Sequence, residues 1–372
     1  DIAYLRGMEG LTPEFLNYLE DLQFTGTIKA FADGEIFFEN EPILRVTAPM
    51  IQAQLLETYI LNALGFSISV ATKAARIVSA AQGHRLSDFS PRRCHSMESA
   101  MKVAKYSYMV GFASTSNVLA GKEYGIPVSG TVAHSFITAC RTEEEAFDKL
   151  LSNGVGVILL DTYDTKKAIN RLVKHPKANR LKGVRLDSGN LNELSRYVRK
   201  TLDKAKLDNV GIIASGDLDE YKIAKLIKSG APINSFGVGT ALGTCNDAPA
   251  LGITYKLVQY NNWPTMKLSN GKVTLPGVKQ VYRYRHHGSG TFEKDMIGLI
   301  PEAEHGYNEV MLGDLAMSDA PSLHKSRESF LRDGDPAFLL FLNTSAKPKV
   351  EISKSLKELA AALRRDIMRQ NQ

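Results

Sequence analysis

The stretch GVRLDSGN at residues 183–190 begins with a short β-branched and apolar run and ends in small and polar residues. Three similar runs lie around it: VGVILLD from residue 155, VGIIASGD from residue 210 and SFGVGT from residue 235. Their spacing of roughly 25 to 28 residues is the length of one strand followed by one helix. Strands of this largely apolar kind are typical of a parallel sheet that is buried on both faces.

The polar residues at the ends of these runs favour one particular parallel fold. An earlier run, IPVSGTVA at residues 126–133, also ends beside polar residues, which makes five such strand ends. In a (β/α) barrel the site is built from the carboxyl ends of the strands, so the five ends predict one shared pocket. A doubly wound open sheet is the alternative, and it would concentrate chemistry at a single switch point. We predict an α/β protein with an irregular (β/α) barrel.

The barrel is predicted to span residues 96–251. The segments at residues 25–48 and 253–260 are β-rich, and two core helices are predicted at residues 50–64 and 70–83. The N- and C-terminal parts, residues 1–95 plus about 252–372, are therefore predicted to form a second, α+β domain.

Composition narrows the class of protein. Of the 372 residues, 44% are hydrophobic and 23% are charged, which is the profile of a soluble globular protein. We find no apolar run near the ~18 residues that span a bilayer, and expect no membrane contact. The net charge of +6 comes from 46 basic residues interleaved with 40 acidic ones, without a basic stripe. This favours a small polyanionic substrate over nucleic acid. The chain starts at Asp1 inside an apolar, helix-like stretch, so we expect a missing N-terminal segment.

The cysteines indicate a reducing compartment. The three cysteines, Cys94, Cys140 and Cys245, are far apart and form no CxxC pair. Neither a zinc site nor a disulfide framework is predicted, and a cytoplasmic location fits.

Two glycine-containing loops look suited to phosphate. In SFGVGT, Gly237 and Gly239 allow an anion to approach the backbone, and Thr240 adds a hydroxyl. In IIASGD, Ser215, Gly216 and Asp217 form a second such loop on the neighbouring predicted strand. The alternative is a pair of tight turns without a ligand.

GVRLDSGN carries charged residues at a strand end. Arg185 and Asp187 alternate along the strand, so both side chains point to the same side. Facing the barrel mouth, Arg185 would bind an anion with two hydrogen bonds, and Asp187 would bind ribose hydroxyls or a metal. A buried ion pair between them is the alternative.

Two further clusters suit a phosphorylated or flat ligand. DTYDT contributes Asp161 and Asp164, which suggest Mg²⁺ held mainly through substrate phosphates, with helix capping as the alternative. DFSPRR places Phe89 beside Arg92 and Arg93, a combination that suits a flat anionic ligand. For the two arginines the alternative is an ordinary surface position.

SGTVAHSFI at residues 129–137 places His134 three residues after Thr131. The histidine is either a buried core residue or a nucleophile or phosphate acceptor at the mouth of the site. No predicted strand ends in lysine, which disfavours a Schiff-base aldolase. GxxxxGK[ST] is absent as well, so no Walker-type nucleotide site is predicted.

Taken together, SGTVAHS, LLDTYDT, GVRLDSGNL, IIASGDLDEY and SFGVGT resemble nicotinate phosphoribosyltransferase. DFSPRR, GFASTSNVLAGKEYGIPVSG and GITYKLV also fit this family, so the resemblance runs through nearly the whole chain. It implies that nicotinate attacks 5-phosphoribosyl 1-pyrophosphate to give nicotinate mononucleotide and pyrophosphate, in NAD salvage. It also implies ATP hydrolysis coupled through a phosphohistidine, Mg²⁺, and a homodimer with active sites shared across the interface.

The resemblance also implies roles for individual residues. It makes His134 the phosphohistidine and, with Asp187, a catalytic residue. Nicotinate would bind Thr131, Arg185, Phe89, Arg93 and Ser116. The phosphoribosyl group would bind Thr240, Gly239, Gly237, Gly216, Ser215, Asp217, Ser188 and Gly189, and Mg²⁺ would lie near Asp161 and Asp164.

Nicotinamide-using relatives carry an acidic residue near the position of Ser116, so a neutral serine there favours a carboxylate substrate. The chain departs from the family in two places. It lacks the family's initial TDxYxxTM-like motif, whose tyrosine reaches the partner subunit's pocket, and DFSPRR has Ser90 and Pro91 in place of the usual glycine-containing version. We therefore expect a fragment. The alternatives are a nicotinamide or quinolinate phosphoribosyltransferase, or a truncated, non-catalytic barrel that only binds phosphoribosyl ligands.

Overall fold

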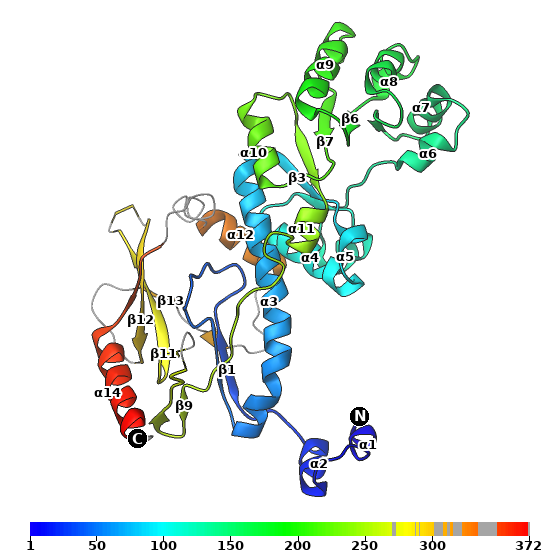
Figure 1. Cartoon of the computed structure of the whole chain (residues 1–372). Helices are drawn as coiled ribbons and strands as arrows, with labels where there is room; N and C mark the ends of the chain where they lie inside the picture. Colours follow the sequence, from blue (N-terminus) through cyan, green and yellow to red (C-terminus); the bar gives the residue numbers. More distant parts are fainter. Residues whose placement is uncertain are drawn as a thin grey trace.

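A parallel sheet of six strands, curled into half a barrel, forms the upper part of the molecule in Figure 1. The computed structural model describes residues 1–269, 273–286, 288–289, 291–300, 308–310, 313–314, 322–333 and 348–370. The strands lie in the order β4-β3-β8-β7-β6-β5, and each neighbouring pair is parallel. Their bounds are β3 Arg85–Asp88, β4 Ser114–Thr115, β5 Val157–Leu159, β6 Gly183–Leu186, β7 Gly211–Ala214 and β8 Ser235–Val238. The predicted irregular parallel barrel is confirmed in this form.

The helices that follow β5, β6 and β7 begin at capping side chains. Asp164, Asn190 and Asp219 each accept a backbone N–H of the first turn of the helix that they precede. These caps start each helix a few residues after its strand, so the polar strand ends lie together at one rim of the sheet. The helices of this part are α4 Met97–Met109, α5 Val118–Tyr124, α6 His134–Thr138, α7 Glu143–Ser152, α8 Thr165–Leu172, α9 Leu191–Lys204, α10 Glu220–Lys228 and α11 Thr240–Thr244, with short 3₁₀ helices η1 Pro91–Arg93 and η2 Ala178–Arg180.

The two faces of the sheet differ in polarity. Ile158, Val184 and Ile212 are directly paired across three strands and fully buried, and they belong to the main hydrophobic core. Because side chains alternate along a strand, Arg185 and Asp187 lie on the opposite face from Val184. The expectation of strands apolar on both faces is thus wrong for β6, whose second face carries the polar residues of the site.

The structure around the sheet differs from the prediction in three respects. β3 and β4 were missed because they are short and rich in serine, and β3 joins the sheet although the prediction placed residues 1–95 in the other domain. The run at residues 126–133 forms only an isolated bridge, from Val128 to Thr115. The stretch from Glu98 to about Gly121, whose pattern predicts one helix, forms two helices, α4 and α5, separated by β4.

Helix α3, Met50–Ala81, is one continuous helix where two were predicted. The segment between the predicted helices contains Gly65 but no proline, so nothing in it breaks the ladder of backbone hydrogen bonds. The stretch Met50–Ala80 is, by length and composition, long and apolar enough to cross a membrane, which corrects the expectation that no such run exists. Its second half instead packs on α4, α10 and β3, where Lys73 pairs with Glu220 at 2.8 Å.

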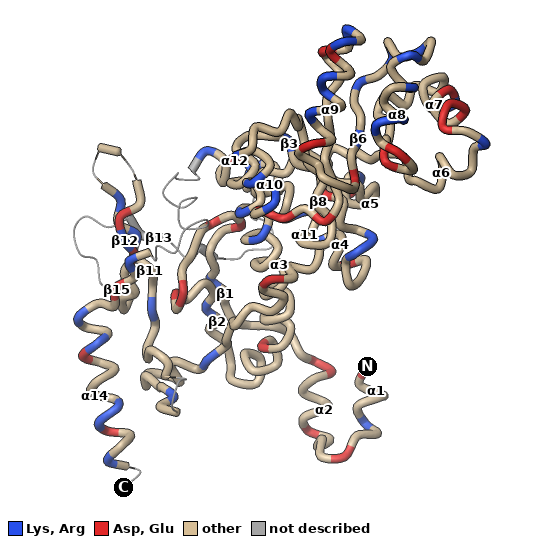
Figure 2. The backbone as a smooth tube through the Cα atoms, turned by 45° about the horizontal axis from the view of Figure 1, so that its top comes forward, with Lys and Arg blue, Asp and Glu red and all other residues tan. Residues whose placement is uncertain are grey.

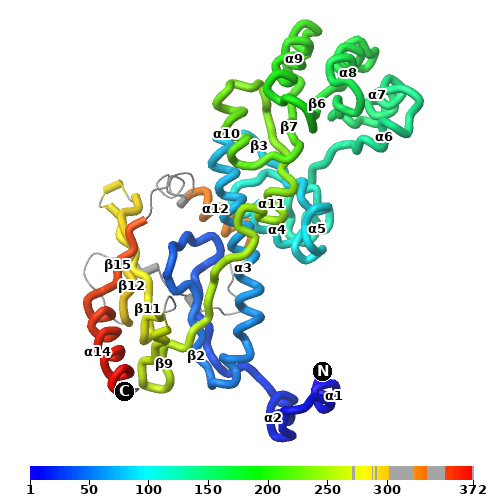
Figure 3. Tube along the Cα trace, in the orientation of Figure 1, coloured from blue at the N-terminus to red at the C-terminus, as the bar shows by residue number. Residues whose placement is uncertain are grey.

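The N- and C-terminal parts meet in a second, α+β part, as predicted (Figure 3). β1 pairs antiparallel with both β14 and β2, and a second sheet has the order β13-β11-β12-β15. The buried Arg283 of β11 joins the N- and C-terminal parts, since it pairs with Asp295 on β12 and with Glu35 of the N-terminal part. The bounds are β1 Thr27–Ala30, β2 Leu44–Thr47, β9 Gln259–Tyr260, β10 Trp263–Pro264, β11 Lys279–Arg285, β12 Phe292–Leu299, β13 Asn308–Val310, β14 Gly313–Asp314, β15 Val350–Ile352, α12 Leu323–Asp333 and α14 Lys354–Gln370.

The first residues form a separate arm. Helices α1, Ile2–Leu5, and α2, Pro13–Glu20, lie near the start of α3, away from the six-stranded sheet and from the α+β part (Figure 1). The dipeptide Asn270–Gly271, which predicts a turn between two β-rich runs, lies outside the described residues. The division into domains at residues 95 and 251 stays a prediction, with β3 placed as described above.

Candidate active site

Arg185 is the centre of a polar network at the carboxyl end of β6. Its Nη1 donates a hydrogen bond to the Thr131 hydroxyl at 2.7 Å, and its Nε donates to the Ser215 hydroxyl at 2.8 Å. Its Nη2 lies 2.6 Å from Oδ1 of Asp187. One guanidinium thus joins the segment before α6 to the ends of β6 and β7. The predicted alternation of Arg185 and Asp187 toward one side agrees with this geometry.

Asp187 is held in its ionised form by the same network. Its Oδ1 also accepts the Ser215 hydroxyl at 2.6 Å. Burial by itself raises the pKa of Asp187, but the Ser215 hydrogen bond and the Arg185 guanidinium outweigh it, so the pKa lies below its usual value. The ion pair is only partly enclosed, because the Arg185 and Asp187 side chains are 12% and 20% exposed. The carboxylate therefore offers a charged group to the open face of the sheet.

His134 lies beside this carboxylate and is open to solvent. Its Nε2 is 3.7 Å from Oδ2 of Asp187, and its Nδ1 is 3.2 Å from the Thr162 hydroxyl. The side chain is 44% exposed, so His134 is not the buried core histidine that was one alternative. Thr162 was missed by the sequence analysis, which took only the acidic residues from DTYDT. Its place between Asp161 and Tyr163 was the available signal.

The ring of Phe89 lies over the Arg185 guanidinium. Its centroid is 5.6 Å from Cζ of Arg185, a distance at which a cation and an aromatic face attract. A Cβ at Gly237 would lie 2.4 Å from two carbons of this ring, so only glycine leaves room for it. Gly237 therefore has a steric role beside the phosphate role predicted for it, and that predicted role stays untested.

The loop after β7 touches the end of β6 backbone to backbone. Gly216 has φ +95°, and a Cβ there would lie 1.9 Å from the carbonyl oxygen of Asp187. Asp217 is also left-handed, with φ 48°, and its carbonyl accepts the Lys222 ammonium at 2.6 Å. Gly189, with φ +78°, follows the end of β6. The IIASGD loop is thus a tight turn, and the phosphate roles predicted for this loop and for SFGVGT stay predictions.

The two carboxylates proposed for Mg²⁺ have different surroundings. Oδ2 of Asp161 accepts the Ser188 hydroxyl at 2.5 Å and the Asp187 N–H at 3.1 Å, while its buried Oδ1 has no partner among the described residues. Asp164 instead accepts the Lys167 N–H at 2.9 Å and caps α8, as the alternative held. The part of the chain that the structure describes gathers no three His, Cys, Asp or Glu that could hold a metal. Asp161 alone therefore fits a Mg²⁺ that substrate oxygens would complete.

The contacts described above for the Arg185 network do not include Ser116, Arg93 or Thr240. Ser116 follows β4, and its N–H donates to the Asp88 carbonyl at 2.8 Å. Arg93 is exposed in η1, and Thr240 is the first residue of α11, after Gly239. Their roles stay predictions.

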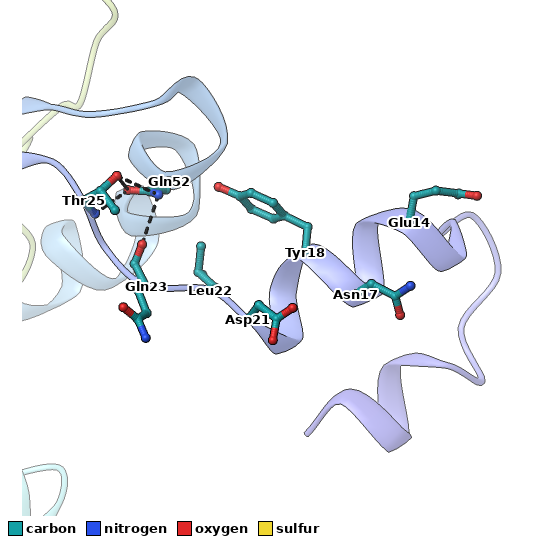
Figure 4. Close-up of a pocket in the computed structure, with 8 residues that line it drawn as sticks. All are labelled: Glu14, Asn17, Tyr18, Asp21, Leu22, Gln23, Thr25 and Gln52. Atoms are coloured by element: carbon teal, nitrogen blue, oxygen red, sulfur yellow. Dashed lines mark hydrogen bonds between the residues drawn. The ribbon is translucent and has the colours of Figure 1, made fainter.

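Two hollows of the described surface lie away from these residues. One, of about 510 Å³, lies between α2 and the start of α3, where Gln52 hydrogen-bonds the Gln23 carbonyl and Thr25 (Figure 4). Another, of about 450 Å³, lies between α8 and α9 and contains Tyr197 and Lys200. Basic and acidic residues interleave along the helices around the sheet (Figure 2). The converging polar groups define the site.

Two family models match the chain. The model of the nicotinate phosphoribosyltransferase N-terminal domain matches residues 1–65, and that of the nicotinate phosphoribosyltransferase family matches residues 84–274. The second match contains every residue of the network described above.

Individual relatives agree with the family match. A nicotinate phosphoribosyltransferase of Mycobacterium tuberculosis is 45% identical over 83% of this chain and 66% of its own length. One from Caenorhabditis elegans is 31% identical over 98% of this chain and 78% of its own length. The chain spans slightly less than two thirds of the mycobacterial relative.

Solved structures show the same fold. The crystal structure of human nicotinic acid phosphoribosyltransferase has a TM-score of 0.80 at 25% identity, covering 98% of this chain and 88% of that one. Nicotinate-nucleotide pyrophosphorylase from Pyrococcus furiosus has a TM-score of 0.70 at 25% identity, covering 84% of this chain and 81% of that one.

Proposed function

The chain belongs to the nicotinate phosphoribosyltransferase family, and from this premise we propose that it transfers a phosphoribosyl group to nicotinate. The products would be nicotinate mononucleotide and pyrophosphate, in NAD biosynthesis in the cytoplasm. The observation that carries the proposal is the Arg185 network, because a planar guanidinium beside an aromatic ring suits a flat aromatic carboxylate.

In the proposed complex, the fork of Arg185 binds the nicotinate carboxylate and Thr131 adds a hydroxyl contact. Phe89 stacks on the pyridine ring and fixes the plane in which the ring nitrogen meets the sugar. The neutral Ser116 favours a carboxylate over an amide. Arg93 is the further group assigned to nicotinate, supported only by the family resemblance.

The phosphoribosyl group is proposed to lie across the neighbouring strand ends. Its ligands would be Ser188, Gly189, Ser215, Gly216, Asp217, Gly237, Gly239 and Thr240. As the glycosidic bond breaks, positive charge develops on the sugar, and the ionised Asp187 is suited to stabilise it. Mg²⁺ would supply neutralisation of the leaving pyrophosphate, with Asp161 as its protein ligand. Asp164 is a weaker candidate because it caps α8.

We also propose that ATP hydrolysis is coupled through phosphorylation of His134. An exposed imidazole, oriented by Thr162 and beside Asp187, is accessible to a γ-phosphoryl group. The expected result for His134→Ala is a folded protein whose turnover rate no longer rises with ATP, so the ratio of rates with and without ATP falls to about one. His286→Ala, which removes an exposed imidazole directly after β11, is the control. An unchanged ATP ratio in His134→Ala would refute the coupling.

A homodimer is proposed because one face of α3 is apolar and uncovered. Ile51, Leu55 and Tyr59 follow one another at four-residue spacing and are 44%, 46% and 75% exposed. A second copy of the chain, sharing its active site, is the proposed occupant. Leu55→Glu is expected to raise the dimer dissociation constant at least about tenfold, read from light-scattering mass across a dilution series. Met368→Glu, an equally exposed position on α14, should leave the mass unchanged. Equal masses for Leu55→Glu and the parent across the dilution series would contradict a dimer interface on this face of α3.

Pyridine competition tests the proposed function. The protein is incubated with phosphoribosyl pyrophosphate, Mg²⁺ and ATP and offered nicotinate, nicotinamide and quinolinate together, and the mononucleotides are identified by mass. Nicotinate as the pyridine consumed is the expected outcome. Consumption of nicotinamide or quinolinate would move the chain to one of the related activities, and absence of product with intact ligand binding would indicate a non-catalytic phosphoribosyl-binding barrel.

A further inference from the structure

Asp88 is a fully buried carboxylate at the end of β3 that no part of the proposed reaction uses. It is 0% exposed, and so is its neighbour Ser90. Oδ1 of Asp88 accepts the Ser90 N–H at 2.8 Å, and Oδ2 accepts the Thr115 hydroxyl at 2.7 Å. Both oxygens therefore have partners, one on the loop after β3 and one on β4.

The hydrogen bonds of Asp88 continue into two loops that carry proposed nicotinate residues. The Thr115 oxygen in turn accepts the Asn117 N–H at 3.0 Å, and the Asp88 carbonyl accepts the Ser116 N–H at 2.8 Å. On its other side, Asp88 directly precedes Phe89, whose N–H donates to the Val238 carbonyl at 2.8 Å. One residue thus connects the backbone of Phe89 with the backbone of Ser116.

The carboxylate is in an unusual position for a purely structural group. Among the described residues, no basic side chain forms an ion pair with Asp88. Burial raises its pKa, and the hydrogen bonds from Ser90 and Thr115 offset only part of that effect. Burying a carboxylate without a counter-charge is costly, and an amide or hydroxyl would tie the same loops with less desolvation. The arrangement is explained if the strength and direction of two charge-assisted bonds are needed to hold the loops.

We infer that Asp88, acting through Thr115, is a positioning residue that sets the separation between Phe89 and Ser116 and thereby the fit of the pyridine ring. The inference deepens the proposed function and rests on it. Asp88 does not contact the substrate, because its side chain is fully buried. Its carboxylate acts on the ligand through these two loops, and of the two only the Phe89 loop also contacts β8, through the Val238 carbonyl. We therefore expect the effect on pyridine binding to exceed the effect on phosphoribosyl binding.

Thr115→Val and Thr115→Ser separate positioning from simple stability. Valine has the shape of threonine but can neither donate to Asp88 nor accept from Asn117, whereas serine keeps the hydroxyl. We expect Thr115→Val to weaken nicotinate binding about tenfold, with phosphoribosyl pyrophosphate binding unchanged and Thr115→Ser close to the parent. Binding is measured by titration calorimetry without Mg²⁺, so that no turnover consumes the ligands.

Two further variants test whether Asp88 positions the pyridine site: one changes Asp88 itself and the other is a control. Asp88→Asn keeps an acceptor for the Ser90 N–H but removes the charge, and it should weaken nicotinate binding in the same direction. Ser195→Ala removes a hydroxyl that is equally buried in α9, bonded to the Asn192 carbonyl, and should leave both affinities unchanged. Equal nicotinate binding by Thr115→Val and the parent, or equal losses for both ligands, would overturn the inference alone. A parent that binds no pyridine would overturn the proposed function and this inference with it.

Discussion

Replacing Arg185 with alanine is expected to weaken nicotinate binding about a hundredfold while changing the affinity for phosphoribosyl pyrophosphate only a few-fold. The guanidinium is the one basic group described at the centre of the network, and a bidentate contact to a carboxylate cannot be replaced by the remaining hydroxyls of Thr131 and Ser215. Both affinities are measured by titration calorimetry on the same preparation.

The Arg185 experiment also distinguishes a binding role from a structural one. Alanine leaves Asp187 without its nearest cation, so the pKa of that carboxyl should rise toward its usual value. Arg185→Lys keeps the positive charge but loses the planar guanidinium. It should therefore restore the lowered pKa of Asp187 without restoring nicotinate binding. Uniform loss of both ligands in Arg185→Ala, restored together by lysine, would mean that Arg185 only holds the strand ends.

The second large effect is expected at Gly216. An alanine Cβ would lie 1.9 Å from the carbonyl oxygen of Asp187, and φ +95° is strained for any residue with a Cβ. Because the obstacle is backbone, the ends of β6 and β7 must separate. We expect Gly216→Ala to lower the free energy of unfolding by about 3 kcal/mol or more and to abolish turnover. Chemical denaturation and the mononucleotide assay measure the two effects.

Gly83→Ala is the matched control for Gly216. It has a similar left-handed backbone, φ +86°, but nothing lies within 4 Å of the added Cβ, so only the conformational cost of about 1 kcal/mol remains. A Gly216→Ala protein as stable as Gly83→Ala would show that the two strand ends are not in contact.

Local patterns predicted a large part of the fold. β5, β6, β7 and β8 follow directly from β-branched runs at regular spacing, since this periodicity is a property of the chain itself. β3 and β4 were missed because RLSD and ST become strands only through pairing with neighbours that lie far away in sequence. The continuity of α3 was likewise underestimated, because Gly65 weakens a helix without ending it.

The site shows the same division. Sequence alone determined that Arg185 and Asp187 share one side of a strand, because side chains alternate with a period of two, and its motifs determined the family. Only the tertiary structure decided that Thr131, Ser215 and His134 lie beside these two residues. It also decided that Asp164 caps a helix, while Oδ1 of Asp161 has no hydrogen-bond partner among the described residues. Finally, it showed that Gly237 leaves room for the ring of Phe89. The physical reason is that hydrogen bonds and contacts between different strand ends depend on how the sheet curls and in what order its strands lie, and neither is written in any one segment.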